Sequence, residues 1–128
     1  MRRGGALPVL AAVAGWLAWR RPFRVVVEGV SMASALRPGD QLLCVRRRRI
    51  RRGDVVVVRP PSHDVEMVKR VTGLPGDPMG ARTLGEDEYQ VEGDDPLRST
   101  DGRSFGPVAR RDILGVAVLR YLPDPRLL

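Results

Sequence analysis

The sequence predicts a mostly β protein: an antiparallel β-sheet domain with one hydrophobic helix at its N-terminus. Segments rich in β-branched residues recur along the chain, and turn-forming residues separate them at intervals of about 8–15 residues. After residue 22, no segment has the convincing period of an amphipathic helix. Closely spaced short strands without intervening helices favour antiparallel hairpins. With 128 residues, the chain is long enough for one domain and a short appendage.

An uncharged run from Gly4 to Trp19 opens the chain, with a pair of arginines on either side. As a helix, these residues would extend about 24 Å, against roughly 30 Å for the hydrocarbon core of a bilayer. Flanking arginines and Trp16 suit a membrane interface, and Pro22 ends the helix. We expect residues 1–22 to form an uncleaved membrane anchor or signal anchor. The alternative is a helix buried in the globular domain, and the arginines at both ends leave the orientation open.

The strands follow in order from their β-branched content and their flanking turns. They are expected over residues 23–30, 41–46, 55–59, 64–73, 88–92 and 114–122. Residues 79–87 are expected to form a hairpin loop, residues 93–107 a loop without helical period, and the proline-containing tail an irregular end. Residues 23–128 therefore form one β-rich domain.

Composition limits the chemistry that the chain can perform. Its net charge of +7 suggests anionic neighbours, either a membrane surface or nucleic acid. The single cysteine, Cys44, excludes an internal disulfide and a zinc site of paired cysteines, and its apolar surroundings favour a buried thiol. The basic run 46–52 is expected to be a solvated loop or the guard of an edge strand, or else to contact anionic lipid headgroups. No aromatic residues interleave with it, which disfavours nucleic acid.

Lys69 is the only lysine among 22 basic side chains. Arginine cannot serve as a base near neutral pH, whereas a desolvated lysine can. In a strand, Lys69 shares a face with Val65, Met67 and Val71, because side chains alternate between faces. Such an apolar row disfavours the ammonium and lowers the pKa of a lysine. The alternative is a surface lysine at the edge of a strand.

Ser31 lies at a junction between a strand and a turn and is the candidate nucleophile. A serine hydroxyl needs an adjacent base, and both His63 and Lys69 are candidates. A Ser–Lys dyad is a known variant of this scheme. A neutral lysine also needs an orienting partner, which Ser99 or Ser104 could supply from the loop. Backbone N–H groups at the turn of Ser31 would stabilise the charge that develops on a substrate carbonyl oxygen.

Three linked motifs resemble the type I signal peptidase family. They are GVSM with ALRPGD, then MVKRVTGLPGD, then VEGDDPLRSTDGRSFGPV, and the likeness extends from residue 1 to about residue 122. The family consists of membrane-anchored Ser/Lys proteases with a β-rich domain on the bilayer surface. The short layout is similar to actinobacterial members and to mitochondrial inner-membrane peptidases. The resemblance implies a single N-terminal anchor, a catalytic domain over residues 23–128 on the extracytoplasmic face, and no metal or other cofactor. The implied partners are a preprotein or propeptide substrate and membrane lipid, without nucleic acid.

The resemblance also implies a role for each matching residue. Ser31 is the nucleophile, Lys69 is the general base and Ser99 orients the lysine amine. Gly29 and Met32 belong to the substrate pocket or to the turn. Asp94 and an ion pair of Asp101 with Arg103 support the loop that carries Ser99.

The chain departs from the family pattern at the nucleophile turn. Ser34 and Ala35 stand where proline and threonine are usual, and Gly29 stands where many members carry a hydroxyl that helps to bind the oxyanion. No change removes a member of the dyad. The departures bear on rate and substrate preference more than on activity itself.

The leading hypothesis is a membrane-bound serine endopeptidase that removes N-terminal leaders carrying small side chains before the scissile bond. A dedicated maturation protease, such as one for nickel-type superoxide dismutase, keeps the same chemistry with another substrate. A repressor-type autoprotease shares the dyad, but its usual DNA-binding domain is lacking here. The non-enzymatic alternative is a basic β-domain that binds anionic membranes or nucleic acid.

Overall fold

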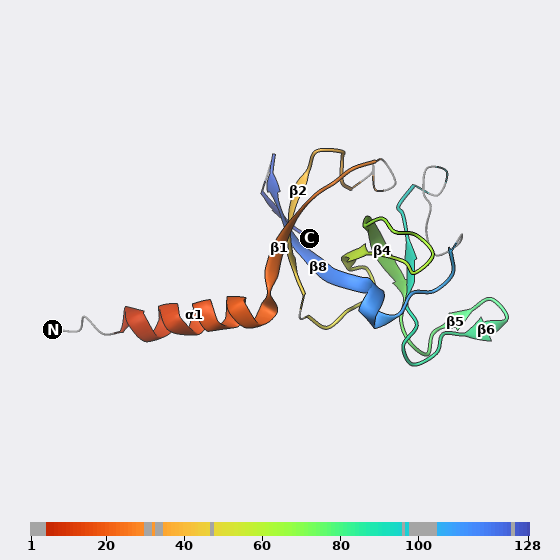
Figure 1. The fold of residues 1–128 in the computed structure, drawn as a ribbon, viewed down its shortest axis with the longest axis horizontal. Helices are drawn as coiled ribbons and strands as arrows, with labels where there is room; N and C mark the ends of the chain where they lie inside the picture. The colour runs from red at the N-terminus through yellow and green to blue at the C-terminus, as the bar shows by residue number, and fades with distance from the viewer. Residues whose placement is uncertain are drawn as a thin grey trace.

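The computed structural model describes residues 5–29, 32, 35–46, 48–95, 97, 105–123 and 125–128. One helix, α1 (Ala6–Arg20), extends away from a β-sheet domain that contains the rest of the secondary structure apart from short helical turns (Figure 1). The expected fold class, a mostly antiparallel sheet with one N-terminal helix, is confirmed.

One antiparallel sheet carries most of the domain. Its strands lie in the order β1-β2-β8-β3-β4-β7, with β9 paired to β8, and a separate hairpin joins β5 to β6. The bounds are β1 Pro22–Val26, β2 Gln41–Val45, β3 Val55–Val58, β4 Met67–Gly73, β5 Pro78–Met79, β6 Arg82–Thr83, β7 Gln90–Glu92, β8 Ile113–Leu122 and β9 Arg126–Leu127.

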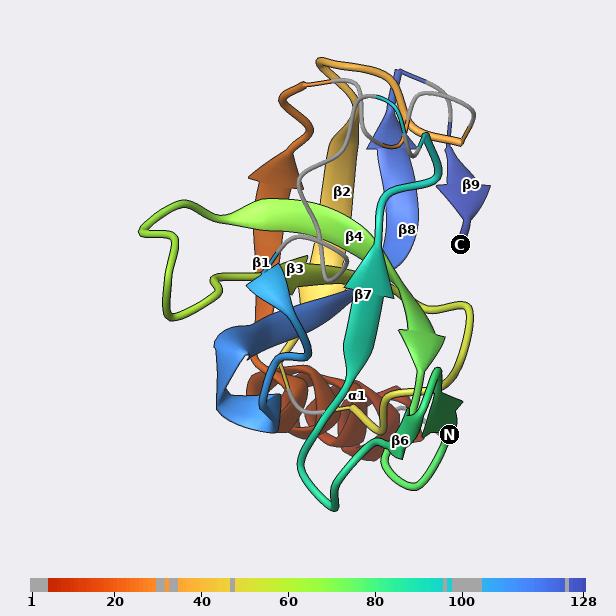
Figure 2. The same cartoon turned by 90° about the vertical axis from the view of Figure 1, so that its right-hand side faces the viewer.

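The long strand β8 joins the two halves of the sheet. Its first half pairs with β3 and its second half pairs with β2, and Val116 lies opposite both Val56 and Val45. Irregular register on both sides of β8 bends the ladder, as bulges do. In Figure 2, β3 and β4 therefore cross the direction of β1 and β2. Strand β1, which precedes Gly29, and strand β4, which holds Lys69, consequently belong to one continuous sheet.

Two apolar clusters pack against opposite faces of β3, because its four buried valines alternate between them. The first cluster contains Val27, Met32, Leu36, Leu42, Cys44, Val55, Val57 and Ala117. The second contains Ile50, Val56, Val58, Val71, Val91, Val108, Ile113 and Val116. Cys44 is fully buried, as expected, and this burial raises the pKa of its thiol to about 12.

The segment before Lys69 differs from the expectation for residues 64–73. β4 begins at Met67, and Val65 is exposed, so the prediction that Val65 belongs to the apolar row is wrong. The ladder with β3 closes at the pair of Val58 and Met67. Beyond it, the N–H of Arg59 donates to Asp112, and Pro60 has no N–H to continue the pairing.

The other strand ends follow local backbone geometry. β1 ends at Val26, short of the expected residue 30, and Gly29 has a φ of +77°, which breaks an extended chain. The hairpin loop expected over residues 79–87 is shorter in the structure: β5 and β6 form a hairpin over residues 78–83. A separate turn follows, in which the N–H of Glu88 donates to the carbonyl of Gly85. The tail is less irregular than expected, because Arg126 pairs with Arg120 in β9.

Helix α1 presents its apolar side chains to solvent. None of its residues is buried, which excludes the alternative of a helix inside the domain. The helix ends where Arg21 adopts a φ of +55° and its N–H donates to the carbonyl of Leu17, and Pro22 then begins β1. Within the ranges that the structure describes, no helix has the length and apolarity needed to span a membrane.

A substitution at Gly115 tests the packing at the centre of the sheet. A Cβ at this position would collide with the ring of Phe23 and lie 2.8 Å from the carbonyl oxygen of Val45. We expect Gly115→Ala to lower the free energy of unfolding by about 1–3 kcal/mol in a urea titration. Gly15→Ala, in α1 with no atom within 4 Å of the new Cβ, is the control and should not destabilise the protein. Equal unfolding midpoints for Gly115→Ala and the parent protein would contradict this packing.

Candidate active site

Lys69 lies in β4 with only 3% of its surface exposed. It is paired with Val56 of β3, which is fully buried, and β4 is covered on its other edge by β7. Met67 and Val71, on the same face of β4, pack in the second cluster. The expected burial of this lysine is confirmed, and the alternative of a surface lysine is excluded. Burial of this kind removes the side chain from water, which is costly for a charged group that is not paired.

Several of the predicted site residues lie outside the described part of the chain. They are Ser31, Ser99, Asp101 and Arg103, together with Ser34 of the turn and Ser104 of the loop. The roles predicted for them stay predictions.

The residues that flank Ser31 have defined positions. Gly29 lies in the left-handed region of backbone space, which side chains rarely adopt and glycine adopts readily. Met32 is 2% exposed and belongs to the first cluster, where Val68 of β4 also packs. The carbonyl of Met32 accepts hydrogen bonds from the N–H groups of Ala35 and Leu36, at 2.9 and 2.6 Å. The described residues nearest to Ser31 are therefore a glycine with a left-handed backbone and a methionine that is buried in the core.

A buried carboxylate fastens this turn to the sheet. The backbones of Val27 and Asp40 are joined by a 2.8 Å hydrogen bond, and the N–H of Gly39 donates to the carbonyl of Val27. The carboxylate of Asp40, which is 4% exposed, accepts the N–H of Arg37 at 2.9 Å and lies 3.5 Å from the guanidinium of Arg120 in β8. The carboxylate of Asp40 therefore closes the turn at residues 37–40. Sequence reasoning missed the pair with Arg120, because 80 residues separate the two side chains.

A two-pronged ion pair joins β4 to the start of the long loop. Nε of Arg70 donates to Oδ1 of Asp94 at 2.9 Å, and Nη2 donates to Oδ2 at 3.1 Å. A third donor of Arg70 bonds the carbonyl of Gly53 at 2.8 Å. The hydrogen bond with Asp94 holds the pKa of the Arg70 guanidinium above its usual value. Because Arg70 follows Lys69 directly, this pair fixes the strand on the face opposite the amine.

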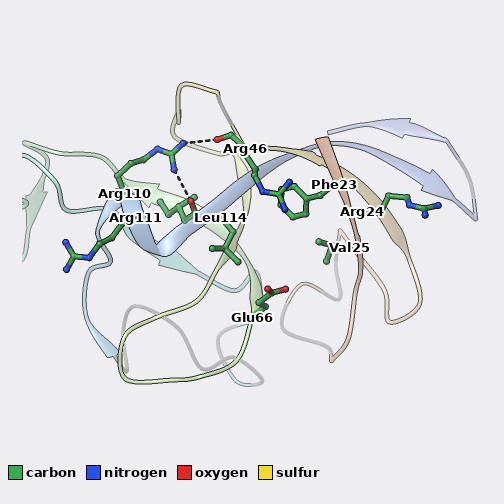
Figure 3. A pocket seen from close by; sticks show the side chains of 9 residues that line it. Phe23, Arg24, Val25, Arg46, Glu66, Arg110, Arg111 and Leu114 are labelled. Atoms are coloured by element: carbon green, nitrogen blue, oxygen red, sulfur yellow. Dashed lines mark hydrogen bonds between the residues drawn. The ribbon is translucent and has the colours of Figure 1, made fainter. Parts of the chain in front are cut away.

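A cleft of about 760 Å³ lies beside β1 (Figure 3). It is lined by Phe23, Arg24, Val25, Arg46, Glu66, Arg110, Arg111, Ile113 and Leu114. The guanidinium of Arg46 lies over the ring of Phe23, 4.2 Å from its centroid, and Arg110 donates to the carbonyl of Arg46. One wall is β1, which leads toward Ser31, and another is Glu66, three residues before Lys69. Sequence reasoning missed this cleft because its walls come from four separate segments.

His63, the other candidate base, lies in the loop between β3 and β4, as expected. Its Nδ1 is 2.9 Å from the hydroxyl of Ser62, and its ring is tilted against that of Phe105 with the centroids 5.6 Å apart. These contacts place His63 against a neighbour in sequence and an aromatic ring. His63 is therefore not enclosed by aliphatic strands as Lys69 is.

Comparison with known proteins adds independent information. A family model described as "Signal peptidase, peptidase S26" matches residues 5–82 and 78–122. The chain is similar to mitochondrial inner membrane protease subunit 1 of Xenopus tropicalis, with 34% identity over 114 residues that cover 77% of this chain and 68% of the relative. It is also similar to signal peptidase I V of Bacillus subtilis, with 29% identity over 135 residues that cover 70% of this chain and 80% of the relative. Mitochondrial inner membrane protease subunit 2 of Schizosaccharomyces pombe is 36% identical over 118 residues, covering 78% and 64%.

The ion pair between Arg70 and Asp94 can be tested without reference to activity. Asp94→Asn keeps the shape of the side chain and removes its charge, so the guanidinium loses its charged partner. We expect the free energy of unfolding to fall by about 1–2 kcal/mol in a urea titration. Glu86→Gln, at an exposed carboxylate, controls for the loss of one negative charge and should change little. If both variants unfold at the parental midpoint, the pair does not stabilise the fold.

Proposed function

Because the chain belongs to the signal peptidase S26 family, we propose that it is a serine endopeptidase that removes N-terminal leader segments with a dyad of Ser31 and Lys69. The observation that carries this proposal is the burial of the only lysine of the chain in β4. An amine kept among valines has no evident use as a surface charge, whereas a Ser/Lys mechanism requires it.

In the proposed reaction, the neutral amine of Lys69 accepts the hydroxyl proton of Ser31 while the serine oxygen attacks the scissile carbonyl. The backbone N–H at the turn of Ser31 stabilises the oxyanion that forms. The ammonium of Lys69 then gives its proton to the leaving amine of the substrate. The amine of Lys69, neutral again, activates the water that hydrolyses the acyl-enzyme. Ser99 orients the amine. Asp94, Asp101 and Arg103 hold the loop that carries Ser99.

The leader would lie in an extended form along β1. This strand is the last one at its side of the sheet, so a substrate backbone can pair with its outer edge. The cleft of Figure 3 borders the same strand and offers Phe23, Val25 and Leu114 as apolar contacts. A substrate that follows β1 in this way is led toward the turn of Ser31, where Gly29 and Met32 shape the pocket for small side chains.

Helix α1 would hold the enzyme at the membrane. Its exposed leucines and valines have no partner within the described domain, and relatives of the chain bear the name of inner membrane proteases. In this proposal residues 1–22 are the single anchor and residues 23–128 are the catalytic domain on the extracytoplasmic face. Arginines next to the helix reach the headgroup region and compensate for its short length.

Replacing Lys69 with arginine tests the dyad directly. Lys69→Arg keeps a positive charge but provides no base near neutral pH. We expect kcat/KM on a leader-bearing peptide to fall by at least about a thousandfold. Ser31→Ala should lose activity to the same extent, and the double variant should be no worse than either single one, because the two residues act as a unit. Cleavage by a folded Lys69→Arg protein at the parental rate would refute the mechanism.

The pH dependence of cleavage tests which form of the amine is active. Only the neutral amine accepts a proton, so kcat/KM should rise as the pH increases and then reach a plateau. The rise should be absent from the residual activity of Lys69→Arg. A parental profile that is flat from acid to alkaline pH would show that no titrating base limits the reaction.

A further inference from the structure

We propose that a groove where helix α1 meets the sheet binds the headgroups of anionic phospholipids. The groove, about 260 Å³ in volume, lies between the last turns of α1 and the segment that follows β2. It is lined by Trp16, Arg20, Val45, Arg48, Arg49, Arg51 and Val118. We call this the headgroup groove. It adds a defined lipid site to the proposed membrane attachment and is independent of the dyad.

The exposed side chains of α1 that lead to the headgroup groove change in the order in which a membrane interface changes. The exposed aliphatic side chains of α1 come first, then Trp16 and Trp19, and then Arg20. The guanidinium of Arg20 lies 5.3 and 5.2 Å from the ring centroids of Trp16 and Trp19. Tryptophan is enriched where the hydrocarbon of a bilayer meets its headgroups, and arginine is suited to the phosphates beyond.

The segment that carries the groove arginines begins at the end of the helix. The N–H of Arg46 donates to the carbonyl of Arg20 at 2.8 Å, and Nη1 of Arg46 donates to the carbonyl of Arg21 at 3.1 Å. These bonds tie the start of the basic segment to the last residues of α1. The basic segment therefore starts beside the end of α1, where the headgroup region would lie.

Positive charge in the headgroup groove is only partly neutralised by the protein. Arg48 lies 3.7 Å from Asp54. Arg49 and Arg51 are exposed, and their side chains form no ion pair with the residues that the structure describes. Their guanidinium forks are suited to phosphate oxygens. An anionic surface thus offers these two arginines the ion-pair partner that the described residues do not provide.

A bilayer fits these observations better than nucleic acid does. Nucleic acid would satisfy the arginines but would leave the aliphatic side chains of α1 in water. An anionic bilayer covers both, since its headgroups face the arginines and its hydrocarbon faces the helix.

The test compares the full-length parent protein with two variants that lose the same charge. Arg49→Gln with Arg51→Gln alters the headgroup groove. Arg37→Gln with Arg126→Gln is the control, because Arg37 borders the last residues of β8 and Arg126 lies in β9, at the end of the sheet away from α1 (Figure 2). Binding is measured by flotation with vesicles of phosphatidylcholine alone and of phosphatidylcholine mixed with phosphatidylglycerol. Circular dichroism checks that each protein is folded.

We expect the parent and the control to prefer vesicles that contain phosphatidylglycerol, and the groove variant to lose this preference by roughly tenfold or more. Inorganic phosphate should not displace the parent from the vesicles. Equal losses in both variants, no preference in the parent, or displacement by inorganic phosphate would overturn the proposal. Tighter binding of the parent to single-stranded DNA than to the anionic vesicles, lost in the groove variant, would assign the groove to nucleic acid instead. Cleavage of a leader peptide in detergent should be unaffected in the groove variant, so failure of the dyad and failure of the lipid site are separable.

Discussion

The burial of one amine in a sheet of valines is the constraint on which the candidate site depends. Removing an ammonium from water is costly unless the charge is paired, so the burial of this side chain constrains what surrounds it. The sheet enforces that environment from several directions. β3 supplies Val56 beside Lys69, β4 supplies Met67 and Val71 on the same face, and β7 closes the other edge of the strand. The chain belongs to the signal peptidase S26 family, and the proposed Ser/Lys mechanism would use this buried amine.

Two ion pairs hold the irregular segments to this rigid frame. Asp40 and Arg120 join the turn after Met32 to the central strand, and Arg70 and Asp94 join the lysine strand to the start of the long loop. Both carboxylates also lie in hydrogen-bonded settings that a lone surface pair lacks, since Asp40 accepts a backbone N–H and Asp94 is gripped by two donors of one guanidinium. Functional loops positioned by a rigid scaffold are the usual arrangement in enzymes. Here each of the two irregular segments is joined to a strand of the sheet by an ion pair.

Much of this arrangement follows from local sequence. Alternation correctly placed Lys69 with Met67 and Val71, and β-branched content located the main strands to within a few residues, because these signals act between neighbours. Val65 was misplaced because the strand limit is set by Arg59 and Pro60, which end the pairing from the opposite strand. The central position of β8, the pair of Asp40 with Arg120 and the cleft beside β1 all depend on segments far apart in the chain. A local sequence pattern does not predict contacts between such distant segments.

The joint between α1 and β1 has a geometric consequence for an enzyme of the proposed kind. The helix passes into the sheet through a single left-handed residue, Arg21, without an intervening linker, and Arg46 clasps the carbonyls of Arg20 and Arg21. The domain therefore has little freedom to swing or to stretch away from its helix. For a substrate that emerges from the same lipid layer, this joint would set the height above the lipid at which a peptide bond can be cut. The geometry of one backbone turn would then limit the length of leader that the enzyme can remove.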